Sequence, residues 1–311
     1  MKLVSVFLIT YKHEQFIGQA IESIVSQKVN FDFELVIGED YSPDNTRAIC
    51  EQYAQKYPHI INLLPSDRNY GPMPNTIRTL QACTGKYIAL CEGDDYWLDP
   101  NKLQKQVDFL EAHPDFSMSF ADAEIIGDVK PGEIILLNNT KDVYTIEDFI
   151  MSPMNIIPTA TLLFRNVLPN PLPEFCHRAI AGDMIIQLLA ADKGKAWHFH
   201  ERHAVYRIHS GGVTRSQENI EKGEIALKQA YRDLNEHFGH RYDKIFRQRF
   251  LEMSKMKLIY GSREKKGVEK MRHYFKTIPD YFKYSKGINL RELAYYHLVL
   301  FFPSLLKTLK K

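Results

Sequence analysis

Short apolar runs alternate with amphipathic stretches along the first part of the chain. Five runs rich in β-branched and aromatic residues have the length of buried strands, and they span residues 3–9, 33–37, 60–64, 87–91 and 116–121. Between them, apolar residues recur at the three- and four-residue spacing of helices over residues 16–25, 46–56, 75–82 and 103–112. This alternation predicts an α/β fold whose central sheet is mainly parallel and is flanked by helices on both faces.

The pattern changes in the middle of the chain, where residues 125–182 are irregular and rich in proline. The elements expected next are a strand at 158–164, a helix at 183–191 and short strands at 196–199 and 204–208. Beyond residue 215 the chain becomes helical and basic. We therefore expect an α/β domain over residues 1–215 and a C-terminal helical region over residues 216–311.

The composition is that of a folded, soluble protein, because 44% of the residues are hydrophobic and 25% are charged. A formal net charge of only +2 provides no strong attraction for a polyanion, so no nucleic-acid partner is expected. The cysteines match no zinc or redox spacing, and we expect reduced thiols. They are Cys50, Cys83, Cys91 and Cys176.

The N-terminal residues bear on localisation. They carry one lysine and then an apolar run that is too short for a signal peptide. No uninterrupted apolar run in the sequence is long enough to span a bilayer. The sequence therefore predicts a cytoplasmic protein.

Acidic residues follow two of the predicted strands, as Glu39-Asp40 and as Glu92-Gly93-Asp94-Asp95. In sheets of this kind, ligands bind beyond the carboxyl ends of the strands. Carboxylate oxygens suit Mg²⁺ and Mn²⁺, and clustered carboxylates repel one another unless a cation lies between them. The 92–95 segment is therefore a candidate metal site, although the residue types alone equally describe a solvated acidic turn.

The first acidic pair suggests a different role. A carboxylate at a strand end can accept hydrogen bonds from a base or a ribose, and we favour this role for Asp40. The competing interpretation is a helix cap, which we favour for Asp44.

The residues after the first strand exclude several enzyme classes. Thr10-Tyr11-Lys12-His13 stands where a dinucleotide-binding dehydrogenase or a sugar nucleotidyltransferase would carry a glycine-rich loop. No Walker A sequence is present, which argues against a P-loop ATPase.

Two later positions carry chemistry that the residues alone leave open. Asp183 begins a predicted helix, where it serves either as an N-cap or as a general base facing an acceptor hydroxyl. His209 follows Arg207 and precedes Gly211-Gly212. A lone histidine is more often structural, but beside a glycine loop it can join a diphosphate or metal site.

These motifs, occurring together and in this order, resemble the family 2 glycosyltransferases, an inverting group with the GT-A fold. Residues 4–11 are similar to the first strand of that family, and residues 38–46 to its acidic nucleotide-binding turn. Residues 85–97 resemble the strand that carries its Asp-x-Asp motif. The resemblance covers roughly residues 1–212 and implies a GT-A fold for the first domain.

The resemblance also implies roles for individual residues. Asp94 would bind the Mn²⁺ or Mg²⁺ ion that bridges the two phosphates, and Asp183 would be the catalytic base. The residues implied around the nucleotide sugar are Thr10, Tyr11, Glu39, Asp40, Asn75, Glu92, Asp95, Arg207 and His209. Glu39 and Glu92 stand where the family more commonly has aspartate.

The activity implied is metal-dependent, inverting transfer of a hexosyl or N-acetylhexosaminyl group from a nucleotide sugar, foremost a UDP sugar. The acceptor would be a hydroxyl of a glycan or a lipid-linked molecule in cell-surface polysaccharide synthesis. One alternative is a transferase-like module that binds a sugar nucleotide or glycan without turnover, and another is a scaffold for other transferases.

The C-terminal segment, residues 290–309, has apolar residues at helical spacing with basic residues near its ends, and Pro303 interrupts it. It is either a helix docked on the domain or an amphipathic helix on a membrane surface. The second interpretation would place the protein peripherally at the inner face of the cell membrane and would suit a lipid-linked acceptor.

Overall fold

Two units make up the computed structural model of the chain, Met1–Ala230 and Tyr231–Lys311. The structure describes residues 2–127, 141–152, 156–179, 182–209, 217–260 and 267–285. The division between the units falls within α7 (Gln217–His237), whereas the sequence places the boundary just before this helix.

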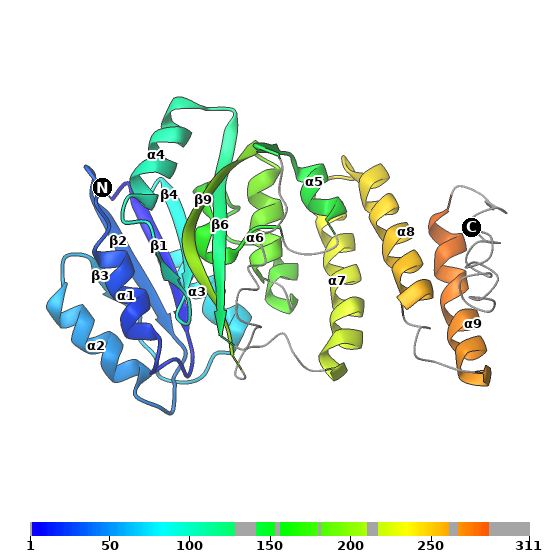
Figure 1. Cartoon of the computed structure of the whole chain (residues 1–311), viewed down its shortest axis with the longest axis horizontal. Helices are drawn as coiled ribbons and strands as arrows, with labels where there is room; N and C mark the ends of the chain where they lie inside the picture. Colours follow the sequence, from blue (N-terminus) through cyan, green and yellow to red (C-terminus); the bar gives the residue numbers. More distant parts are fainter. Residues whose placement is uncertain are drawn as a thin grey trace, which may run out of the picture. The chain divides into compact units, whose positions relative to one another are not determined.

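The strands of the first unit form one sheet, which Figure 1 shows. They are β1 (Val4–Thr10), β2 (Phe33–Glu39), β3 (Ile61–Leu63), β4 (Tyr87–Glu92), β5 (Tyr96–Trp97), β6 (Phe116–Gly127), β7 (Val143–Tyr144), β8 (Leu163–Arg165) and β9 (Lys195–Ile208). Their order is β3-β2-β1-β4-β8-β6-β9-β5, and β7 also pairs with β9.

The strand directions combine a parallel core with antiparallel additions. β3, β2, β1 and β4 are parallel, and so are β6 and β9. β8 lies antiparallel between β4 and β6, and the short strands β5 and β7 are antiparallel to β9. The predicted α/β fold with a largely parallel central sheet is therefore confirmed.

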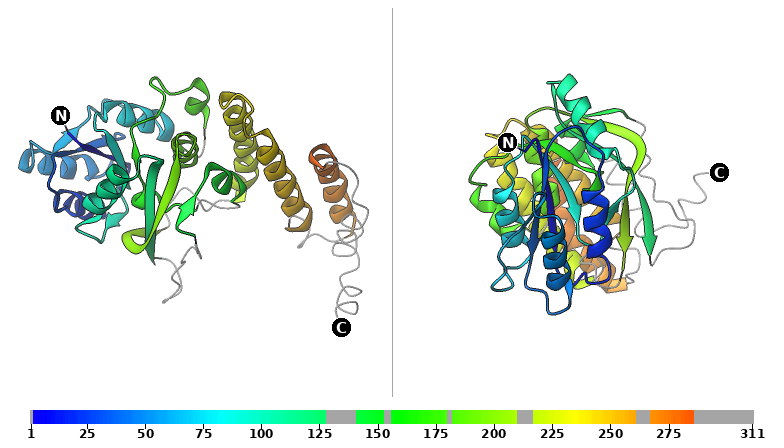
Figure 2. Two further views of the ribbon diagram at one scale, coloured as in Figure 1. Left: turned by 90° about the horizontal axis from the view of Figure 1, so that it is seen from above. Right: turned by 90° about the vertical axis from the view of Figure 1, so that its left-hand side faces the viewer.

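Helices cover both faces of this sheet (Figure 2). They are α1 (Ile17–Val25), α2 (Thr46–Lys56), α3 (Pro72–Ala82), α4 (Lys102–Ala112), α5 (Ile146–Met151) and α6 (Gly182–Ala191). Val6 and Leu8 of β1 are buried in one cluster with Ile17 and Ile21 of α1. The intervening residue Phe7 points to the opposite layer, where α3 packs against β1 and β2.

The parallel register brings three strand ends to one edge of the sheet. Thr10 is opposite Glu39, and Ile9 is opposite Glu92. The backbone N–H of Asp40 donates to the Thr10 carbonyl over 3.0 Å, and that of Gly93 donates to the Ile9 carbonyl over 3.0 Å. Both acidic segments therefore lie at the carboxyl edge, as the sequence predicts.

A buried tryptophan follows the second acidic segment. Trp97 is 4% exposed, and its indole N–H donates to the Ala160 carbonyl over 2.8 Å. The Lys102 ammonium lies 4.3 Å from the Trp97 ring centroid and donates to Gln106 Oε1 over 2.8 Å. Burial lowers the pKa of Lys102 to about 7.

Two element predictions are wrong in detail. Residues 158–164 do not form one strand, because Pro158 leads into a 3₁₀ turn, Thr159–Thr161, and only then does β8 begin. The two short strands expected at 196–199 and 204–208 are one long strand, β9. Its polar middle looks like a break in sequence, but it accommodates a register shift: Phe199 pairs with Ala121 and Arg202 with Asp122.

The second unit is helical, as predicted. α8 (Asp243–Tyr260) packs against α9 (Gly267–Tyr284) through a small cluster that includes Leu258, Ile278 and Tyr281. The segment at 290–309, on which the membrane prediction rests, lies outside the described residues. Within the described part of the chain, no helix is both long and apolar enough to cross a membrane.

Candidate active site

The turn after β4 lies directly over the end of β1. Glycine is required at position 93, because a Cβ there would come within 2.4 Å of Thr10 Oγ1 and 3.0 Å of His13 Nδ1. The Thr10 hydroxyl itself lies 3.3 Å from His13 Nδ1. This close approach places the carboxylates that follow Gly93 beside the His13 ring.

β9 brings a third piece of chain to the same place. Tyr96 and Trp97 of β5 pair with Val205 and Ala204 of β9, so the end of β9 runs alongside the acidic turn. The backbone N–H of Arg207 donates to Asp95 Oδ1 over 2.9 Å.

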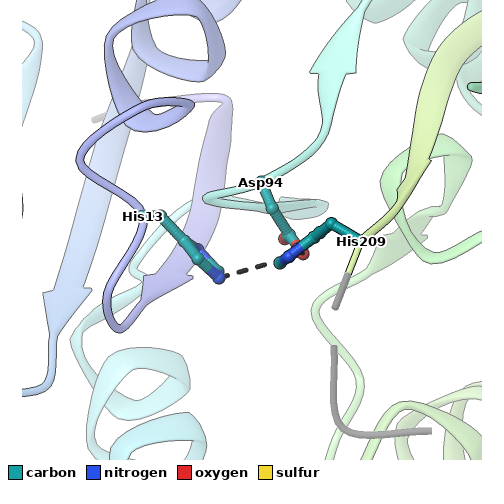
Figure 3. Close-up of side chains that lie close together, drawn as sticks. All are labelled: His13, Asp94 and His209. Atoms are coloured by element: carbon teal, nitrogen blue, oxygen red, sulfur yellow. Dashed lines mark hydrogen bonds and ion pairs between the residues drawn. The ribbon is translucent and has the colours of Figure 1, made fainter. Parts of the chain in front are cut away.

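Three side chains from these pieces converge, as Figure 3 shows. His209 Nε2 lies 3.0 Å from Asp94 Oδ2, and His13 Nε2 lies 3.8 Å from the same oxygen. All three residues are half-buried, and one ligand atom from each lies within 4.8 Å of the others. Two imidazoles and a carboxylate form a donor set for a divalent metal ion.

An aromatic box holds the arginine of β9. The Arg207 guanidinium lies 4.9 Å from the ring centroid of Phe16 and 4.9 Å from that of Tyr96, and it donates to Gln19 Oε1. The His209 ring packs on the same Phe16, with centroids 5.1 Å apart. Arg207 and His209 are two residues apart at the end of a strand, and this spacing places them on one side.

Burial and the neighbouring carboxylates raise the pKa of two residues of the turn, Glu92 and Asp95. Burial, followed by Asp95, Asp94 and Asp183, raises the pKa of Glu92 well above its ordinary value. Burial and Asp94 raise the pKa of Asp95 in the same way, and the Arg207 backbone N–H opposes the shift. Burial lowers the pKa of His13, so its ring favours the neutral form. A cation bound here would therefore stabilise the clustered carboxylates.

Asp183, the predicted catalytic base, comes from a different element. Asp183 lies in the first turn of α6 and is half-buried. Its charge contributes to the raised pKa of Glu92, which places it near the acidic turn.

The acidic pair at the end of β2 accepts hydrogen bonds from backbone N–H groups of the protein. Asp40 Oδ1 accepts the Tyr70 backbone N–H over 2.7 Å, and Oδ2 accepts that of Gly71 over 3.0 Å. Glu39 is fully buried, and its Oε1 accepts the Ser42 backbone N–H over 2.6 Å.

Asn75 also makes its contacts within the protein. Its side-chain amide donates to the Gly38 carbonyl over 2.7 Å, and its Oδ1 accepts from Arg78 Nε over 2.8 Å. The remaining predicted residues, Thr10 and Tyr11, differ in exposure: Thr10 is buried, whereas Tyr11 is 40% exposed at the carboxyl edge.

His13, Phe16 and Gln19 belong to this site, and the sequence assigned none of them a role. They lie at the start of α1, where the His13 carbonyl accepts the backbone N–H of Phe16 over 2.9 Å. The available signal was their position immediately after β1, whose end faces the ligand edge of a parallel sheet. Nothing local indicates that β9 would meet them.

Known proteins share both the sequence pattern and the fold. The profile of the family described as Glycosyl transferase family 2 matches residues 5–160. The uncharacterized protein Rv1520 of Mycobacterium tuberculosis is 31% identical over 226 residues, which span 68% of this chain and 61% of that protein. The minor teichoic acid biosynthesis protein GgaB of Bacillus subtilis is 28% identical over 225 residues, 68% of this chain and 24% of GgaB.

Among solved structures, S. aureus TarS 1-349 in complex with UDP-GlcNAc superposes with a TM-score of 0.65. It is 17% identical, and the match covers 91% of this chain and 81% of TarS 1-349. At this level of identity, the similarity shows that the two chains share a fold.

Proposed function

The chain belongs to glycosyl transferase family 2, and we propose that it is a metal-dependent, inverting enzyme that uses a nucleotide-diphosphate sugar. The sugar would pass to a hydroxyl of a glycan or lipid-linked acceptor in the synthesis of a cell-surface polysaccharide. The observation that carries the proposal is the meeting of His13, Asp94 and His209 at the carboxyl edge of the sheet. The complex of TarS with UDP-GlcNAc supports a UDP sugar as donor, and the name of GgaB supports a polysaccharide acceptor.

The residues present fit a divalent ion. Two imidazole nitrogens and one carboxylate oxygen converge near the half-buried carboxylate of Glu92 and the buried carboxylate of Asp95. Nitrogen ligands favour Mn²⁺ over Mg²⁺ in such a set. When bound, the ion would stabilise the negative charge that develops on the leaving diphosphate.

Arg207 and Asp95 would lie on the diphosphate side of the site. The Phe16 and Tyr96 rings hold the guanidinium in place, so a positive charge is positioned beside the turn without a large loss of side-chain entropy. The bond from the Arg207 backbone to Asp95 fixes the end of β9 against the turn.

Asp183 would act as the general base. As the acceptor oxygen forms its bond to the anomeric carbon, Asp183 takes the hydroxyl proton, and the bond from that carbon to the diphosphate oxygen breaks. Attack from the face opposite the leaving group inverts the anomeric centre.

Asp40, Thr10, Tyr11 and Glu39 remain our candidates for the base and ribose side. Tyr11 offers an exposed ring at the end of β1, and base stacking on such a ring is common in nucleotide recognition. Because the Asp40 oxygens already accept two backbone N–H groups, each has one remaining lone pair for a base or ribose.

The first test is a thermal-shift panel of nucleotide sugars with and without Mn²⁺, because binding to the native state raises the melting temperature. We expect a UDP sugar to give the largest shift, and only with Mn²⁺ present. The same donor should then support transfer to a polysaccharide or lipid-linked acceptor, measured by release of the nucleoside diphosphate.

Replacement of the base separates an enzyme from a binding module. Asp183→Asn should reduce the transfer rate by about 10²–10⁴-fold and leave the donor-induced shift unchanged. Asp108→Asn, an exposed carboxylate of α4, is the matched control and should retain full activity. Normal transfer by Asp183→Asn would remove the base assignment, whereas donor binding without turnover by the wild type would favour the non-catalytic module.

A further inference from the structure

A second cluster of ligand-type side chains lies away from the candidate active site. Asp99 follows β5, whereas Glu201 and His203 lie in β9, before the pairs that carry Arg207 to the acidic turn. The backbone holds these pieces together, because the Leu98 N–H donates to the His203 carbonyl over 2.9 Å.

His203 is the unusual member of the cluster. It is fully buried, and neither ring nitrogen has a hydrogen-bond partner. Its Nε2 lies 3.6 Å from Asp99 Oδ2 and 3.6 Å from Glu201 Oε2, which is too long for a hydrogen bond. A buried imidazole without a partner carries an uncompensated desolvation cost, unless something lies between it and the two oxygens.

The spacing fits a metal ion. Ligands at 2.0–2.2 Å from a tetrahedral zinc ion lie about 3.3–3.6 Å from one another. The three ligand atoms here lie within 4.8 Å of one another, and the two distances from His203 match the edge of such a tetrahedron.

We propose that Asp99, Glu201 and His203 form a second divalent-cation site, of the zinc class, that ties β9 to the segment after β5. Water would complete the fourth position. The site is independent of the proposed transfer reaction. Its consequence for the molecule is mechanical, since it braces the strand whose end carries Arg207 and His209.

Lys105 would compete with a metal ion for the two carboxylates. Its ammonium lies 2.9 Å from Asp99 Oδ2 and contacts Glu201 Oε2 as well. The Lys105 side chain is 39% exposed, so it can turn to solvent when a metal ion enters. The ammonium neutralises the two carboxylates but leaves His203 without a partner, and the histidine therefore distinguishes a metal site from a simple ion pair.

The test measures cobalt and zinc binding in the full chain carrying Asp94→Asn, so that the first site does not contribute. We expect one Co²⁺ ion per chain by equilibrium dialysis, with the visible absorption of a tetrahedral or five-coordinate nitrogen–oxygen site. Zn²⁺ should displace the Co²⁺ and raise the melting temperature.

Two further variants of the Asp94→Asn chain should change Co²⁺ affinity in opposite directions. His203→Leu fills the pocket with an apolar side chain and should weaken Co²⁺ binding at least 100-fold without lowering the melting temperature of the metal-free chain. Lys105→Met removes the competing ammonium and should tighten Co²⁺ binding about tenfold, a difference of about 1.4 kcal/mol. Arg202→Met, an exposed neighbour on β9, is the matched control and should change neither value.

The proposal is overturned if Co²⁺ binds equally well to the His203→Leu variant, or if no Co²⁺ binds at all. It is also overturned if Lys105→Met lowers the melting temperature and leaves Co²⁺ binding unchanged, because the lysine would then be the permanent partner of the carboxylates.

Discussion

At the carboxyl edge of the sheet, Asp40 follows β2 and Asp94 follows β4, the two strands that flank β1, but the surroundings of the two aspartates differ. Both oxygens of Asp40 accept backbone N–H groups, from Tyr70 and Gly71. Asp94 instead faces two histidine rings, and it raises the pKa of its carboxylate neighbours. The protein itself supplies donors to the first carboxylate, whereas the second lies among groups that a cation would bring together.

This difference separates two uses of one residue type. A strand-end aspartate whose two oxygens each accept a backbone N–H holds a loop in place, and its loss should appear in stability. A strand-end aspartate that lies beside histidines and other carboxylates should matter for ligand binding, and its loss should appear in activity. The following experiments test that separation, beginning with the largest expected effect.

Asp94→Asn should reduce sugar transfer by about 10²–10³-fold, because it removes the charged metal ligand. The free energy of unfolding should stay within about 0.5 kcal/mol of the wild type, since the change also relieves repulsion with Asp95. The measurements are the rate of nucleoside diphosphate release and urea denaturation. Full activity in this variant would place the metal elsewhere.

Asp40→Ala should lower stability more than it lowers activity. Two backbone N–H groups lose their acceptors, and we expect the free energy of unfolding to fall by about 2–4 kcal/mol. Chemical denaturation measures this loss, with Asp108→Ala as a surface control. A stable variant whose donor affinity has collapsed would show that Asp40 serves the ligand more than the fold.

Gly93→Ala probes the contact between the turn and β1. The added methyl group would overlap the Thr10 side chain, so the turn must move, and we expect a loss of about 1–3 kcal/mol in stability together with weaker metal binding. Gly223→Ala in α7 is the matched control, because a Cβ there meets no atom within 4 Å. That variant should be as stable as the wild type or more so. Equal behaviour of the two variants would contradict the close approach.

The smallest expected effect is a pH dependence at Asp40. Burial raises its pKa above the ordinary 3.8, so the native state holds this proton more tightly than the unfolded chain does. The stability that the proton contributes is complete below pH 3.8 and is lost as the pH rises through the native pKa. The free energy of unfolding of the wild type minus that of Asp40→Asn should therefore fall as the pH rises above 3.8. A difference that grows would reverse the sign of the shift.

The sequence predicts most of the sheet and its family because those signals are local. The apolar runs at β1, β2 and β4 and the acidic residues that follow them are continuous in the chain, and their common edge follows from parallel pairing. The family 2 assignment rests on the same segments and is confirmed.

What the sequence does not show depends on contacts between distant segments. The partners of Asp40 lie thirty residues further along, in a loop without a periodic pattern. The ring of His13 meets that of His209 only because β5 pairs with β9 across more than one hundred residues. The roles of Asp183, Arg207 and the other ligand residues remain predictions for the experiments above.

The buried Trp97 provides an intrinsic fluorescence probe of the candidate active site. The indole lies two residues after Asp95, on the strand that joins the acidic turn to β9, with a lysine ammonium against its ring. Its emission depends on the position of that charge, so a ligand that displaces the turn will change the fluorescence. Trp197→Phe removes the only other tryptophan in the sequence, so that the tryptophan emission of this variant comes from Trp97 alone and reports ligand binding.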